Sequence, residues 1–200
     1  FTCPEFDLDI SRMIESGMMA QFFAIFVPSA KVYARYEKEY KGDDEYIDKC
    51  ASIFNHTVQK YTDVLAKATS AKEILDNYAG HKVSAILTME DGVAVQGDMK
   101  KLDYFHSLGV RALSLTWNYE NCFGYPNSKD PEIMQKGLKD FGKEAVKHMQ
   151  EIGMLVDVSH LSDGGFYDVY KLSKVPFIAT HSNARALCNH SRNMTDDMIL

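Results

Sequence analysis

Residues 156–186, VDVSHLSDGGFYDVYKLSKVPFIATHSNARA, contain two short apolar runs separated by a stretch with a helical pattern. The first run ends at His160 and the second at His181. Both runs have the length of a buried strand, so the segment predicts a strand, a helix and a second strand. A βαβ unit of this kind is right-handed and its two strands are parallel.

The same alternation extends over most of the chain. Strands are predicted at 19–28, 84–90, 111–117, 154–160 and 176–182, and helices at 43–68, 70–80, 98–109, 131–153 and 162–174. Pro28 is expected to end the first strand, Asp43 or Asp44 to cap the first helix, and the TDD sequence at 195–197 to begin a further helix. The order predicts an α/β fold with a parallel sheet, either doubly wound or closed into a barrel.

Composition restricts the class of protein. The chain has 200 residues, 46% of them hydrophobic, and a net charge of -6 that argues against a nucleic-acid partner. Its most apolar window, residues 18–30, is shorter than the roughly 20 residues that span a bilayer, and the first residues do not resemble a signal peptide. The four cysteines are far apart and are expected to be reduced thiols.

Four predicted strands each end on a residue that is a candidate for a functional site: Glu90, Trp117, His160 and His181. The carboxyl ends of parallel strands meet at one edge of the sheet, which carries the active site in a (β/α)8 barrel. A lone histidine at a strand end is more often structural than a ligand, and Glu90 alone is equally consistent with a turn carboxylate. Together, two imidazoles and a carboxylate form the ligand set that Zn²⁺ or a similar ion takes.

The remaining polar candidates are less specific. Asp91 fits a capping role, and Asp157 lies on the opposite strand face from His160, so it is not expected to support that ring. Arg192 follows the last predicted strand; it is either a surface residue or a planar donor for a substrate carboxylate or carbonyl. The other histidines fall on helices or in loops, and we assign them no chemistry; they are His56, His106, His148 and His190.

Residues 144–197, together with ILTMEDG at 86–92 and GVRALSLTWNYEN at 109–121, resemble the membrane dipeptidase (renal dipeptidase) family of zinc metallopeptidases, in its bacterial type. The resemblance implies a (β/α)8 TIM-type barrel that hydrolyses dipeptides with two zinc ions. It implies that Glu90 bridges the ions, that His160 and His181 complete the second ion's shell, and that Arg192 holds the substrate. We therefore expect Glu90, His160 and His181 as catalytic metal ligands.

The sequence departs from the family pattern in three places. The His-x-Asp pair of the first ion does not occur here, and the family's aspartate near the last strand would lie beyond Leu200. Trp117 stands where the better-known members have a histidine, so its indole N–H, Asn118 or a metal ion is expected to replace that histidine. Because such a barrel usually needs about 250 residues, we expect residues 1–200 to be one incomplete barrel domain, without the first and last strands and inactive alone.

The mechanism implied is attack on a peptide carbonyl by a bridging water that two ions deprotonate. Two alternatives stay open: another metal-dependent barrel hydrolase acting on lactones, cyclic amides or phosphoesters, and a non-catalytic peptide-binding barrel in which Trp117 and Arg192 hold a ligand. The resemblance also makes a homodimer an expectation. With no anchor or signal visible, the expected location is cytoplasmic.

Overall fold

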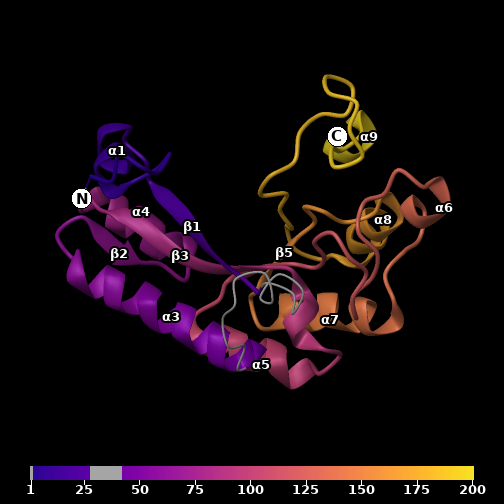
Figure 1. Cartoon of the computed structure of the whole chain (residues 1–200), viewed down its shortest axis with the longest axis horizontal. Helices are drawn as coiled ribbons and strands as arrows, with labels where there is room; N and C mark the ends of the chain where they lie inside the picture. Colours follow the sequence, from indigo (N-terminus) through magenta and orange to yellow (C-terminus); the bar gives the residue numbers. More distant parts are fainter. Residues whose placement is uncertain (1, 28–41) are drawn as a thin grey trace.

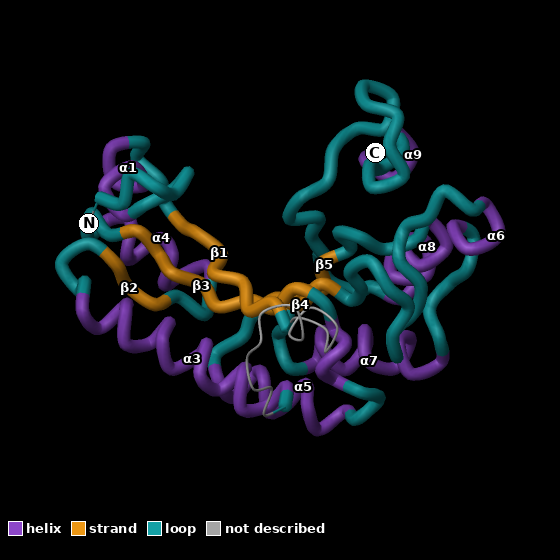
Figure 2. Tube along the Cα trace, viewed as in Figure 1, coloured by secondary structure: helices purple, strands orange, loops and turns teal. Residues whose placement is uncertain are grey.

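The computed structural model describes residues 2–27 and 42–200 and shows one parallel sheet with helices around it (Figure 1). The sheet order is β1-β3-β4-β5. β1 pairs with one edge of β3, and β2 and β4 both pair with its other edge. The strands are β1 Ala20–Phe26, β2 Leu65–Lys67, β3 Val83–Glu90, β4 Ala112–Ser114 and β5 Leu155–Asp157. Figure 2 shows these strands as one continuous band. A parallel bridge between Asp157 and Ile178 continues the order beyond β5. The predicted α/β class is confirmed.

The helices connect these strands as βαβ units require. They are α1 Ile10–Glu15, α3 Asp43–Lys60, α4 Ala71–Ala79, the 3₁₀ helix η1 Gly92–Val95, α5 Met99–Leu108, α6 Pro131–Met134, α7 Asp140–Glu151, α8 Asp163–Leu172 and α9 Asp196–Ile199. Figure 1 shows α3, α5 and α7 side by side along one side of the sheet. Within the described residues, no helix combines the length and apolar character needed to cross a bilayer.

The central strand β3 separates an apolar layer from a polar one. Ala85, Leu87 and Met89 belong to the main core, which buries apolar side chains of α3, α5, α7 and α8. Thr88 and Glu90 alternate with them and line a cavity of about 220 Å³ on the other side. This cavity also reaches polar side chains of β4, β5 and the segment after Ile178, so the sheet presents polar groups toward the edge where Glu90 lies.

Several local predictions are confirmed by the capping contacts. Ser70 accepts a hydrogen bond from Glu73 N at the start of α4, and Gly109 ends α5 with φ 105, a left-handed conformation that glycine adopts without strain. Thr195 caps α9 through Met198 N, as the TDD sequence predicted. Pro28, predicted to end the first strand, lies outside the described residues.

Several predictions about element boundaries are wrong. The helix at 43–68 ends at Lys60, because residues 65–67 pair with β3 instead, and its N-cap is Gly42 and not Asp43 or Asp44. The helix at 131–153 is interrupted between α6 and α7 at Gly137, where a Cβ would lie 2.2 Å from Asp168 Oδ2. The strand at 176–182 forms only the single bridge at Ile178.

Candidate metal centre

Three side chains from distant parts of the sequence meet at the carboxyl edge of the sheet. Glu90 is the last residue of β3, while His160 and His181 each lie three residues beyond a strand position, Asp157 or Ile178. Glu90 Oε1 is 3.2 Å from His160 Nε2 and 3.4 Å from His181 Nε2, and the two imidazole nitrogens are 2.9 Å apart. The structure therefore brings together the three residues that the sequence pattern selected.

This donor set fits a divalent metal ion. In a tetrahedral site with bonds of about 2.0–2.1 Å, neighbouring donor atoms are about 3.3 Å apart, and the three distances lie close to that value. Glu90, His160 and His181 are the one group of three or more His, Cys, Asp or Glu residues with suitably close atoms in the part of the chain that the structure describes. Two imidazoles and a carboxylate suit zinc and related transition metals better than Mg²⁺ or Ca²⁺.

The charges of these groups also suit a cation. A hydrogen bond from His160 and the nearby His181 hold the pKa of Glu90 below its usual value, against the opposing effect of burial. Burial lowers the pKa of His181, which outweighs the effect of Glu90. At neutral pH, Glu90 is consequently a carboxylate and His181 a neutral imidazole, the forms in which both bind metals.

A strained turn directs His160 toward Glu90. Strict alternation along β5 would place His160 on the helix side of the sheet, but its backbone has φ 70, a left-handed conformation that is unusual for a residue other than glycine. Its carbonyl accepts hydrogen bonds from Asn127 N at 2.7 Å, Asn127 Nδ2 at 3.1 Å and Thr116 Oγ1 at 3.3 Å. These bonds hold a conformation that costs about 1–3 kcal/mol.

A second left-handed residue follows Glu90. Asp91 has φ 74 and caps η1 by accepting from Val93 N, which confirms its predicted capping role. Asn121 donates to Asp91 Oδ1 at 3.0 Å and to the carbonyl of Leu115 at 2.8 Å, so it connects the turn after β3 to the segment after β4. Burial raises the pKa of Asp91 in spite of these hydrogen bonds. Sequence reasoning missed Asn121, because its partners are distant in sequence.

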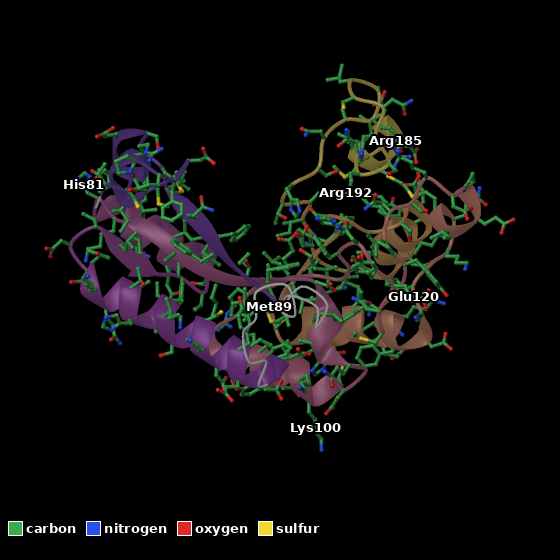
Figure 3. The ribbon with its side chains drawn as sticks, in the orientation of Figure 1. His81, Met89, Lys100, Glu120, Arg185 and Arg192 are labelled. Atoms are coloured by element: carbon green, nitrogen blue, oxygen red, sulfur yellow. The ribbon has the colours of Figure 1, made fainter. Side chains whose placement is uncertain are left out.

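Arg192 lies on the C-terminal segment (Figure 3), and its guanidinium contacts the backbone of His181. Its Nη2 donates to the carbonyl of His181 at 3.3 Å, whereas Nη1 is buried and has no hydrogen-bond partner among the described residues. Burial lowers the pKa of the guanidinium. The segment is held by Arg185, whose guanidinium forms a bidentate pair with Asp163 at 2.7 and 2.8 Å. Arg192 therefore retains a desolvated donor for a further acceptor.

Trp117 lies next to His160 of the triad, and Asn118 follows it in the chain. The Trp117 ring packs on Phe26 with a centroid separation of 4.8 Å and lies 6.3 Å from the His160 ring. Trp117 is half-buried, and Asn118 is exposed. Trp117 comes three residues after β4 ends, since the predicted strand at 111–117 forms ladder pairs only over Ala112–Ser114. Their contacts with a substrate stay a prediction.

Comparison with known proteins identifies relatives over nearly the whole chain. The family description "Membrane dipeptidase (Peptidase family M19)" matches residues 2–200. Dipeptidase aclJ of Aspergillus oryzae is 31% identical over 198 residues, covering 96% of this chain and 46% of its own length. An uncharacterised protein of Acinetobacter calcoaceticus is 30% identical, covering 96% and 65%. The chain thus spans from about half to two thirds of the length of these relatives.

Solved structures of similar proteins also match nearly the whole chain. A metallo peptidase from Rhodobacter sphaeroides, liganded with a phosphinate mimic of the dipeptide L-Ala-D-Ala, is 29% identical with a TM-score of 0.77 over 96% of this chain and 60% of that one. A dipeptidase of family M19 is 30% identical, also with a TM-score of 0.77 and 58% of its chain covered. An amidohydrolase from Pseudomonas aeruginosa at 21% identity and a TM-score of 0.78 shares the fold.

Proposed function

Because the chain belongs to the membrane dipeptidase family, peptidase family M19, we propose that the full-length protein is a metal-dependent dipeptidase. The observation that carries the proposal is the convergence of Glu90, His160 and His181 at one edge of a parallel sheet with the M19 fold. The dipeptide mimic in the Rhodobacter sphaeroides relative supports a dipeptide as the substrate.

We propose that Glu90, His160 and His181 hold a zinc ion, and that Glu90 also faces a second ion whose other ligands are not among these residues. When bound, such ions act as Lewis acids that lower the pKa of water and polarise a carbonyl oxygen. Glu90 contributes the negative charge, and with two histidines in place of two carboxylates the site is less negative than a three-carboxylate site. The histidines favour a transition metal, and a site with three protein ligands would keep a fourth position open for the substrate.

Arg192 is suited to bind the carboxylate of a dipeptide. Its buried Nη1 has no partner among the described residues, and Nη2 is already oriented by the carbonyl of His181. In a dipeptide, only the Cα atom separates the terminal carboxylate from the nitrogen of the scissile peptide bond. A carboxylate bound between Arg192 and the triad would therefore bring that bond close to Glu90. Binding of the carboxylate thereby orients the carbonyl that is attacked.

Trp117 and Asn118 are proposed to contact the substrate at the rim. The indole and Phe26 form an apolar wall beside His160 that excludes water from the reacting groups. The indole N–H and the exposed Asn118 amide are donors for the carbonyl oxygen as it gains negative charge. The homodimer and the cytoplasmic location expected from the sequence stay predictions.

Metal content and hydrolysis of L-Ala-L-Ala and L-Ala-D-Ala by the full-length protein test this function. About two metals per chain and hydrolysis of at least one dipeptide are expected, with activity lost in His160→Ala and in His181→Ala. His148→Ala is the matched control, since that histidine of α7 pairs with Asp103 of α5, away from the triad, and the variant should keep both properties. A full-length protein that binds peptides without metal or hydrolysis would contradict the proposal, as would hydrolysis of lactones or phosphoesters alone.

A further inference from the structure

Asp157 is a buried carboxylate that the proposed chemistry does not use. Its residue is 2% exposed, and it lies at the end of β5 opposite Ser114 of β4. Four donors contact it: Ser114 Oγ at 2.5 Å and Thr180 Oγ1 at 2.6 Å on Oδ2, and Ser159 N at 3.0 Å and Thr180 N at 3.1 Å on Oδ1. Among the described residues, the hydrogen bonds to Asp157 come from Ser114, Ser159 and Thr180, and none joins it to His160.

These four donors keep Asp157 ionised. Burial alone would raise the pKa of its carboxyl, but hydrogen bonds from Ser114, Thr180 and the two backbone amides outweigh burial and hold the pKa below its usual value. A carboxylate has no proton to give, so every contact to Asp157 must be donated by the other group. The hydroxyl of Thr180 therefore uses its one proton in the hydrogen bond that it donates to Asp157.

This hydrogen bond from Thr180 to Asp157 determines the tautomer of His181. Thr180 Oγ1 also lies 2.8 Å from His181 Nδ1, and with its proton already given to Asp157 it is able only to accept there. Nδ1 of His181 must then carry the proton, and the neutral ring has its lone pair on Nε2. Nε2 is the atom that faces Glu90 and His160. The backbone of His181 is held as well, because its N–H donates to Ser159 Oγ at 3.1 Å.

We propose that Asp157 and Thr180 are positioning residues that lock His181 in the Nδ1–H tautomer, with Nε2 ready to accept a metal ion. The proposal rests on the metal site of the proposed function and assigns the side chains that orient one of its ligands. Such supporting groups typically change metal affinity by about 10- to 100-fold when removed. His160 differs, since its buried Nδ1 has no hydrogen-bond partner among the described residues.

The test compares Thr180→Val with Thr180→Ser in the full-length protein. Valine has the shape of threonine without the hydroxyl, whereas serine keeps the hydroxyl and loses a methyl group. Valine and serine are close to threonine in size, and in Thr180→Val the Asp157 carboxylate keeps three of its four donors, so the fold should tolerate both changes. Nitrogen-15 NMR of the metal-free protein reports the tautomer of His181 directly, with His148 on α7 as an unaffected reference.

We expect the wild type and Thr180→Ser to show protonated Nδ1 at His181, and Thr180→Val to shift toward protonated Nε2. Zinc affinity, measured by competition with a chelator, should fall about 10- to 100-fold in Thr180→Val and recover in Thr180→Ser. An unchanged tautomer and unchanged zinc affinity in Thr180→Val would overturn the proposal. A wild type with protonated Nδ1 that binds no metal would instead support the tautomer assignment and contradict the proposed function, so the two failures are distinguishable.

Discussion

The hydrogen bonds of Asn121 predict that this residue matters to stability more than its neighbour Asn118. Asn121→Ala removes a donor to Asp91 Oδ1, a donor to the Leu115 carbonyl and an acceptor for Phe123 N. Asp91, Leu115 and Phe123 are all buried, at 6%, 0% and 0% exposure, so water reaches the released groups poorly. Asn118 is exposed, three residues earlier in the same loop, and is the matched control.

The magnitude follows from the three lost bonds. At about 1 kcal/mol each, with more for the bond to a carboxylate, Asn121→Ala should reduce the free energy of unfolding by about 2–4 kcal/mol. Asn118→Ala should stay within about 0.5 kcal/mol of the wild type. Urea unfolding of the full-length protein should show a lower midpoint at an unchanged slope for Asn121→Ala.

The same variant should affect the metal site, because Asn121 holds the turn that follows Glu90. Zinc affinity is therefore expected to fall in Asn121→Ala and to remain near the wild-type value in Asn118→Ala. Equal unfolding free energies for the two variants would refute the argument that Asn121 connects the turn after β3 to the segment after β4.

Three further changes have defined outcomes. Gly142→Ala places a Cβ 2.1 Å from the Phe123 carbonyl oxygen, so overpacking of about 1–3 kcal/mol should exceed the helix-propensity gain and lower the urea midpoint. Arg192→Met should raise KM for a dipeptide about 10- to 100-fold, since a charged hydrogen bond contributes about 1.5–3 kcal/mol. Asp9 caps α1 by accepting from Arg12 N and also accepts from Cys3 N, and these hydrogen bonds lower its pKa to about 2. The stability that Asp9 contributes is present above about pH 4 and is lost as the pH falls through 2. Hydrogen-exchange protection factors of the α1 amides should show this loss, and in Asp9→Asn the protection factors should no longer depend on pH.

Two of these changes have controls on the same chain. Gly80→Ala at the end of α4 brings the nearest atom only to 3.3 Å and should be nearly neutral. Arg111→Met removes contacts to the carbonyls of His106 and Val110, away from the triad, and should leave KM unchanged. A Gly142→Ala protein as stable as Gly80→Ala, or equal KM values for the two arginine variants, would contradict the packing and binding arguments. Protection factors of the α1 amides that do not change between pH 4 and 2 would contradict the assignment for Asp9.

Local sequence was sufficient wherever an element is determined by its own residues. The strand at 83–90 is a mostly apolar run of strand length, and α4 and α5 have their capping residues and terminal glycines within the same short segment. Parallel strands then place Glu90, His160 and His181 at a common edge, which is why the triad was predictable from where the apolar runs stop.

Tertiary contacts determined the features that the local sequence pattern did not predict. Residues 65–67 form a strand because β3 offers a partner, and the helix at 131–153 breaks where Gly137 meets Asp168. The orientation of His160 depends on a left-handed turn held by Asn127, and the tautomer of His181 depends on Asp157 through Thr180. Sequence determined which residues reach the edge of the sheet; only the packing of distant segments determined how each side chain is aimed, because hydrogen bonds between strands have no periodic signal along the chain.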